Sequence, residues 1–342
     1  MGDNIKIAII SVSNKGLKLA QNLKELLDKD STIIKTDLYH KDVKNTFKLI
    51  FPEYDAVIAI MASGILIRSI APLINSKDKD PAILNIDDKG QFVISILSGH
   101  LGGGNSLTSK VADLLNATAV ITTSTDVNKK LGIDVLARDL YLKINDKSQI
   151  VYFNKAILDN QKIEFKLNSN KNYNYLFEYL KNNTLEMNVL YSYSDKINSD
   201  EIHVFVNEHE IILKEKKIVV GVGCKKNKSS KDIFDAVEKS LDKLNLSPSR
   251  VNCIASASIK KDEKGILDIS KKLNLSVYFV SIDKMKLFTN SDISKSEFVK
   301  SKFGRYGVCE PAALITAGFD SKLIFKKTSY SGVTIAISVS DL

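Results

Sequence analysis

The stretch SILSGHLGGGNSLTSKVADLL, from Ser95 to Leu115, joins an apolar run to a segment with helical spacing. Four of the chain's 16 glycines, Gly99, Gly102, Gly103 and Gly104, fall within it, beside His100, one of only four histidines. Glycine lets a loop turn tightly and bring its backbone close to a ligand. A strand, a glycine-rich loop and a helix in that order predict a layered α/β domain with a ligand site at the loop.

The same plan extends on both sides of this stretch. The apolar runs KIAIISVS (6–13) and YDAVIAI (54–60) predict strands followed by helices, and DDKG (87–90) predicts a hairpin turn. Residues 133–220 contain neither glycine nor proline, and strand–loop–helix patterns then return. We therefore predict an α/β protein in three parts: an α/β domain over 1–130, a less regular α+β middle region over 131–215, and a second α/β domain over 216–342.

Composition limits the function classes. The 342 residues carry a formal charge of +9, which favours nucleic acid, a membrane surface or a polyanionic small molecule as partner. Lysine is spread along the chain without an arginine cluster, which disfavours nucleic acid. No apolar run approaches the roughly 18 residues of a membrane span. The three cysteines form no CxxC pair, so we expect neither a zinc site nor disulfides, and a cytoplasmic setting.

Four loops carry the candidate binding residues: MASGI (61–65), LSGHLGGGN (97–105), TTSTD (122–126) and GVGCKKNKSS (221–230). Ligands of open α/β sheets bind beyond the carboxyl ends of strands, where helix N-termini favour anions. The glycine loop lacks the Lys-Ser/Thr pair of a Walker A loop, and GVGCKK lacks the third glycine of a dinucleotide loop. The candidate substrate-binding residues are Ser63, Gly64, Arg68, Ser98, Gly99, Asn105, Thr123, Asp126, Gly223, Cys224, Lys225 and Ser256.

The candidate catalytic residues centre on His100, because imidazole titrates near neutral pH. Its alternative role is to hydrogen-bond the loop backbone. Backbone amides of Gly102–Gly104 are candidates for an oxyanion pocket. Glu310 begins a predicted helix in CEPAAL, where either a catalytic or a structural carboxylate would suit the helix dipole. Cys224 is a candidate as a reactive thiol or as an inert small residue.

Residues 61–126, from MASGILIRSIAPL to VITTSTD, resemble the N-terminal domain of the CbiG family, the cobalt-precorrin-5A hydrolases of anaerobic cobalamin biosynthesis. GVGCKKNKSS, ASASIKKDEKGI, YGVCEPAALITAG and TSYSGVTIAI resemble that family's C-terminal domain, which it shares with CobE. The resemblance covers about Tyr54–Asp126 and Lys217–Ser338. Gly104 and Ser124 stand where the family pattern has alanine, and the middle region shows no match.

The resemblance implies an enzyme that opens the δ-lactone of cobalt-precorrin-5A and releases acetaldehyde, giving cobalt-precorrin-5B. It implies an anionic corrinoid substrate that carries its own cobalt, and no further cofactor or protein-bound metal. We expect His100 to activate water, or else to ligate the substrate's cobalt, and Lys225, Lys226 and Lys228 to contact carboxylates. A corrinoid carrier without catalysis remains the alternative. A homodimer and contacts with other pathway enzymes both remain open.

Overall fold

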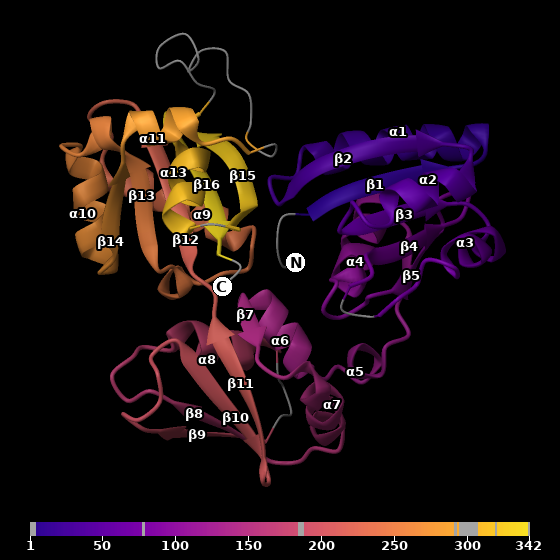
Figure 1. The fold of residues 1–342 in the computed structure, drawn as a ribbon, viewed down its shortest axis with the longest axis horizontal. Helices are drawn as coiled ribbons and strands as arrows, with labels where there is room; N and C mark the ends of the chain where they lie inside the picture. The colour runs from indigo at the N-terminus through magenta and orange to yellow at the C-terminus, as the bar shows by residue number, and fades with distance from the viewer. Residues whose placement is uncertain are drawn as a thin grey trace. The chain divides into compact units, whose positions relative to one another are not determined.

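The computed structural model describes residues 5–76, 79–183, 188–290, 293, 307–318 and 320–340. These residues form three sheets with helices packed against them, which confirms the predicted α/β class (Figure 1). The chain divides into two compact units: residues 1–171 with 181–214, and residues 172–180 with 215–342. Over the described ranges, no helix combines the length and the apolar character needed to cross a bilayer.

The first unit begins with a six-stranded sheet of order β2-β1-β3-β4-β5-β6. Alternate residues of β1 face two separate cores, one shared with α1 and α4 and the other with α2 and α3, so helices cover both faces. Its strands are β1 (Ile5–Ser11), β2 (Ile33–His40), β3 (Ala56–Ile60), β4 (Ala82–Ile86), β5 (Phe92–Leu97) and β6 (Thr118–Val120). Its helices are α1 (Asn14–Asp28), α2 (Val43–Ile50), α3 (Ser63–Ile70) and α4 (Gly104–Leu115).

The predicted hairpin at 87–90 reverses the chain within this sheet. The Asp87 carboxylate accepts hydrogen bonds from the amides of Lys89, Gln91 and Phe92, and Gly90 has a φ of +69°. Strands β1 to β4 are parallel, β5 is antiparallel to β4, and β6 is parallel to β5. The carboxyl ends of β3 and β5 therefore lie at opposite edges of the sheet.

This reversal corrects the expectation that the loops of the first domain converge on one anion site. Ser63, Gly64 and Arg68 follow β3, whereas the glycine loop and the Thr123–Asp126 segment follow β5 and β6 at the other edge. Ser63 donates instead to the side-chain oxygen of Asn85 at 2.6 Å.

The middle region is more regular than predicted, because it forms a five-stranded sheet of order β7-β11-β10-β8-β9. Strand β10 alternates buried apolar side chains with half-buried ones and pairs with antiparallel neighbours on both sides. The strands are β7 (Leu142–Ile144), β8 (Ile163–Leu167), β9 (Val189–Tyr193), β10 (Glu201–Val206) and β11 (His209–Glu215). The helices between β6 and β10 are α5 (Ser124–Val127), α6 (Ile133–Asp139), α7 (Ile150–Leu158) and α8 (Asn174–Asn183).

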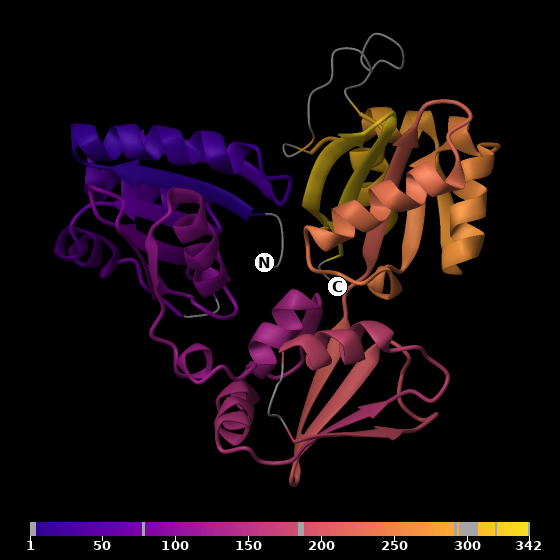
Figure 2. The ribbon, with the colours of Figure 1, turned by 180° about the vertical axis from the view of Figure 1, so that it is seen from behind.

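The second unit holds a sheet of order β14-β13-β12-β16-β15, which ends in the predicted hairpin. Helix α9 crosses the face of this sheet turned to the viewer in Figure 2, and α13 packs against β12 and β16. A methyl group on Gly221 of β12 would lie 2.0 Å from the Cys309 carbonyl oxygen of α13, so only glycine permits this packing. The elements are β12 (Ile218–Cys224), α9 (Ser230–Asp242), β13 (Cys253–Ala257), α10 (Lys264–Leu273), β14 (Ser276–Val280), α11 (Ile282–Leu287), α13 (Cys309–Ala317), β15 (Lys322–Tyr330) and β16 (Val333–Val339).

A buried polar cluster lies inside this second unit. Arg250, 2% exposed, donates to the Lys216 carbonyl oxygen at 2.6 Å and lies 4.0 Å from the carboxylate of Glu215, which is 5% exposed. The Tyr175 hydroxyl donates to the same carboxylate, and the guanidinium lies 5.6 Å from the Tyr175 ring centroid. Tyr175 belongs to residues 172–180, so this cluster joins that segment to the rest of the second unit.

Candidate functional site

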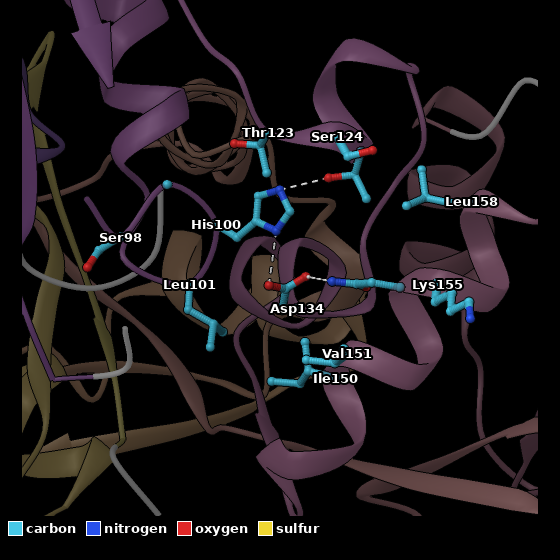
Figure 3. A pocket seen from close by; sticks show the side chains of 13 residues that line it. Ser98, His100, Leu101, Thr123, Ser124, Asp134, Ile150, Val151, Lys155 and Leu158 are labelled. Carbon is cyan, nitrogen blue, oxygen red and sulfur yellow. Dashed lines mark hydrogen bonds and ion pairs between the residues drawn. The ribbon is translucent and has the colours of Figure 1, made fainter. Parts of the chain in front are cut away.

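The first unit contains a cavity of about 430 Å³ beside the glycine loop (Figure 3). Its wall comes from three places: the glycine loop, the segment that begins α5, and helices α6 and α7 of the middle region. The side chains that line it include His100, Leu101, Thr125, Asp134, Ile150, Asn154 and Lys155. The predicted glycine loop and the predicted TTSTD segment therefore form one site, and a region with no predicted chemistry completes it.

The glycines of the loop are needed for its backbone conformation and close packing. Gly103 has a φ of +74°, and a methyl group on Gly99 or Gly102 would lie 2.5 Å from the Asn105 or Ser98 side chain. The amide of Gly103 donates to the His100 carbonyl oxygen at 2.9 Å, and that of Gly104 to the Ser98 carbonyl oxygen at 3.1 Å.

These bonds correct the predicted oxyanion pocket, since two of its three donors are already engaged and their residues are buried. Gly102 is exposed, and its amide donates to no described residue. Of the three predicted donors, it alone is left for a ligand.

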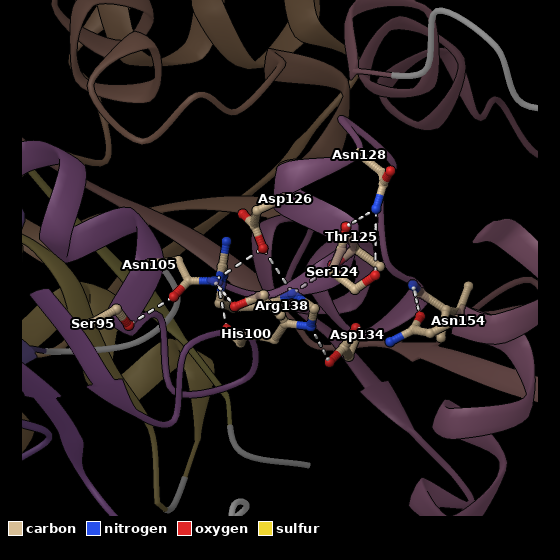
Figure 4. A network of polar contacts seen from close by, with 12 residues as sticks. Ser95, His100, Asn105, Ser124, Thr125, Asp126, Asn128, Asp134, Arg138 and Asn154 are labelled. Atoms are coloured by element: carbon tan, nitrogen blue, oxygen red, sulfur yellow. Dashed lines mark hydrogen bonds and ion pairs between the residues drawn. The ribbon is translucent and has the colours of Figure 1, made fainter. Parts of the chain in front are cut away.

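His100 lies between two carboxylates (Figure 4). Its Nδ1 is 3.1 Å from Oδ2 of Asp134, its Nε2 is 2.9 Å from Oδ2 of Asp126, and the Thr125 hydroxyl is 2.8 Å from Nε2. A carboxylate accepts hydrogen bonds, and a neutral imidazole has a single N–H. Two carboxylate contacts at once therefore require a doubly protonated ring.

The electrostatics agree with this geometry. Burial by itself would lower the pKa of His100, but hydrogen bonds and charge attraction from Asp126 and Asp134 outweigh it and raise the pKa to about 9. Burial opposes ionisation of both aspartates as well, yet His100 holds the pKa of each below its usual value. At neutral pH His100 thus carries a proton it can donate. A protonated ring favours a proton donor over the predicted base that activates water.

Three of the predicted binding residues stabilise the segments around His100: Asn105, Thr123 and Ser98. Asn105, 5% exposed, donates to Oδ2 of Asp126 at 3.0 Å and to the Thr123 hydroxyl at 2.8 Å. Its own side-chain oxygen accepts from the Ser95 hydroxyl at 2.7 Å. Ser98 has a φ of +55°, and its hydroxyl donates to the Asp80 carbonyl oxygen at 2.8 Å. These residues stabilise the loop, and Asn105 also contacts the carboxylate that faces Nε2.

Sequence reasoning missed the residues that the middle region contributes. Asp134 and Arg138 of α6 contact His100, the first through its ring and the second through its carbonyl oxygen. Asn154 of α7 donates to Asp134 at 2.9 Å, and Lys155 follows it on the cavity wall. Asp134 and Arg138 are an acidic and a basic residue four positions apart, a spacing that is common on solvent-exposed helix faces and does not by itself indicate a site. A weak signal was Gly132, the last glycine before the long stretch without one.

The second unit places several predicted site residues out of reach of a substrate. Gly223 is buried beneath Thr334, and Ser256 is fully buried, its hydroxyl bonded to the Val222 carbonyl oxygen at 2.7 Å. Glu310 is fully buried and accepts from the Lys327 amide at 2.8 Å, which is a structural role and corrects the catalytic one.

Two further residues lie at the carboxyl end of β12. Burial raises the pKa of the Cys224 thiol, which disfavours the thiolate and favours the alternative of an inert small residue. Lys225 is exposed on the loop that follows, as is its neighbour Lys226.

Comparisons with known proteins agree with both parts of the chain. The model described as "Cobalamin synthesis G N-terminal" matches residues 45–126, and "Cobalamin synthesis G C-terminus" matches residues 218–338. A protein of Methanocaldococcus jannaschii named "Probable cobalt-precorrin-5A hydrolase" is 34% identical, over 98% of this chain and 99% of its own length. The cobalt-precorrin-5A hydrolase of Priestia megaterium is 28% identical, over 97% of this chain and 94% of its own.

A crystal structure of a cobalamin biosynthesis protein G homolog from Sulfolobus solfataricus aligns with a TM-score of 0.59 at 29% identity, over 99% of both chains. The structure defines an α/β protein with a cavity beside a glycine-rich loop. Within that class, the chain belongs to the cobalamin synthesis G (CbiG) family, as the resemblance of its motifs implied.

Proposed function

We propose that this chain is a cobalt-precorrin-5A hydrolase, which opens the δ-lactone of its substrate and releases acetaldehyde to leave cobalt-precorrin-5B. Relatives named for this activity match nearly the whole chain. The observation that carries the chemistry is a histidine held between two carboxylates on the wall of a cavity. Cobalt enters as part of the substrate.

The reaction needs a proton donor at a defined point. Water adds to the lactone carbonyl carbon, the acyl C–O bond breaks, and the departing oxygen must take a proton. Nε2–H of His100 supplies it, the proton lost by the attacking water then restores the imidazolium, and the exposed Gly102 amide stabilises the oxyanion formed on the way. The resulting alcohol then loses its O–H proton as the bond from its carbon to the macrocycle breaks. Acetaldehyde leaves, and the macrocycle takes up the electron pair and a proton.

A lysine on the cavity wall would hold a carboxylate of the substrate. Lys155 lies there, and no described carboxylate pairs with it. The carboxylate contacts expected of the second unit stay a prediction: Lys225 and Lys226 are exposed, and Lys228 lies 3.6 Å from Asp232. The formal charge of +9 suits a polyanionic ligand.

Changing Lys155 to alanine is expected to raise KM about tenfold while kcat changes little, because one charge-assisted hydrogen bond to a carboxylate is lost. Steady-state kinetics of acetaldehyde release would measure both constants. Lys162→Ala is the matched control, since Lys162 is an exposed lysine that does not line the cavity. A fall in kcat with unchanged KM would exclude the binding role.

The proposed activity is tested by incubating the pure chain anaerobically with cobalt-precorrin-5A, trapping released aldehyde and following the corrinoid by mass spectrometry. Stoichiometric acetaldehyde with formation of cobalt-precorrin-5B is expected. Tight binding of the substrate, with no aldehyde in a single turnover, would favour the carrier instead.

We also propose a cytoplasmic setting, which the three free cysteines fit.

A further inference from the structure

We infer that Asp134 is a positioning residue of this site: anchored by Asn154, it fixes the His100 ring and keeps Nδ1 protonated, so that Nε2 is the nitrogen that delivers the proton. Helices α6 and α7 of the middle region are then part of the acid machinery. The inference rests on the proposed function only for the reaction that this proton serves.

The first support is that both oxygens of Asp134 are committed. Oδ2 faces Nδ1 of His100 at 3.1 Å, and Oδ1 accepts from Nδ2 of Asn154 at 2.9 Å. Asn154 is itself fixed, because its side-chain oxygen accepts from the Ile133 amide at 2.8 Å. Asp134 is 5% exposed and lies in the first turn of α6, where the helix dipole favours a carboxylate.

The second support is the contrast between the two carboxylates that face the ring. The Asp126 side chain is 37% exposed and divides its Oδ2 between His100 and Asn105, so it can yield Nε2 to a substrate oxygen. The Asp134 side chain is 7% exposed and has no such freedom. When the substrate displaces Asp126, Asp134 remains as the charge that keeps the ring protonated and oriented.

Arg138 is the third charged group near the ring. Its guanidinium donates to the His100 carbonyl oxygen and pairs with Asp139 at 2.7 Å. Its positive charge opposes a second proton on the imidazole, whereas Asp126 and Asp134 favour one. Thr125, whose hydroxyl lies 2.8 Å from Nε2, carries no charge. Asp134 is therefore the buried negative charge that balances the imidazolium.

The direction of the pH effect follows from these contacts. The pKa of His100 is higher in the folded chain than in the unfolded chain. The protonated ring therefore stabilises the fold fully below about pH 6.5, and this stabilisation is lost as the pH rises through about 9. Asp134→Asn removes one of the two carboxylates that raise this pKa, while burial continues to lower it. The titration of the ring should therefore move to lower pH by about one to three units.

This expectation is measured on the free protein by NMR titration of the imidazole rings, which is tractable because the chain has four histidines. His100→Gln assigns the signal. Asp159→Asn is the matched control, because Asp159 is an exposed aspartate at the end of α7. Asn154→Ala provides a second variant, which keeps the charge of Asp134 but removes the hydrogen bond that anchors its carboxylate. It should shift the His100 titration less than Asp134→Asn does. An Asp134→Asn signal that titrates like wild type, or a control that shifts equally, would overturn the inference.

Enzyme kinetics distinguish a positioning role of Asp134 from a purely structural one. In Asp134→Asn the alkaline limb of the kcat/KM profile, which reports the free enzyme, should move to lower pH in step with the NMR titration, with KM at neutral pH little changed. A uniform loss of kcat at every pH would contradict the inference. If the wild-type chain released no acetaldehyde, the proposed function would fall, and the ring titration would still decide the role of Asp134.

Discussion

Replacing His100 with glutamine is expected to slow acetaldehyde release about 100- to 10,000-fold, the usual contribution of a positioned acid. Glutamine keeps a hydrogen-bond donor but has no proton to give to the departing oxygen. It also leaves Asp126 and Asp134 facing each other's charge without a cation between them. Single-turnover assays at pH 7 would measure the rate directly, with circular dichroism to verify the fold.

His209→Gln is the matched control, because His209 is an exposed histidine of β11 whose ring lies against Tyr152, 4.0 Å between centroids. It should turn over like wild type. Near wild-type turnover in His100→Gln would remove the acid role. A changed absorption spectrum of bound substrate without loss of rate would instead show that His100 ligates the cobalt.

Changing Arg250 to alanine is expected to lower the free energy of unfolding of the second unit by about 3–5 kcal/mol, because it removes the buried cation that lies 4.0 Å from the buried Glu215 carboxylate. It also removes the hydrogen bond to the Lys216 carbonyl oxygen and the guanidinium over Tyr175. Urea unfolding, followed by far-ultraviolet circular dichroism, should show an early transition for this unit.

The double change Arg250→Met with Glu215→Leu tests the cause, since it removes both charges and fills the space with apolar atoms. It should recover much of the lost stability. Lys231→Ala is the control: it breaks a surface pair with Asp235, in which the lysine side chain is 84% exposed, and should leave the transition in place. An Arg250→Ala chain that unfolds like wild type would show that the buried pair adds nothing.

Much of the fold could be predicted because local patterns decide it. Apolar runs placed β1 and β3, and the DDKG turn placed the β4–β5 hairpin. The same hairpin reverses β5, so Ser63 and Arg68, which follow β3, lie at the opposite edge of the sheet from the glycine loop, and no local pattern shows this. The five-stranded middle sheet could not be predicted as a whole, because it forms only when β7 pairs with β11 and β8 pairs with β10, strands that are not consecutive in the chain.

The site could be predicted only in part, for a related reason. Glycines mark a tight loop in any sequence, but whether their amides remain free depends on bonds such as that from Gly104 to Ser98. His100 stands out by itself, whereas its charge depends on Asp126 and Asp134, which lie 26 and 34 positions away in the sequence. Asp134 becomes functional only through tertiary contact, and no local pattern distinguishes it from a solvated aspartate.

The interleaving of the two units has a consequence for how the chain is made. Residues 172–180 leave the ribosome before residue 215 and everything beyond it, although they belong with that later sequence. Buried side chains such as Tyr175 and Leu176 must therefore wait in the nascent chain, exposed or held by a chaperone, until their partners have been synthesised. Folding of the second unit can be completed only after its later strands, β15 and β16, have been synthesised.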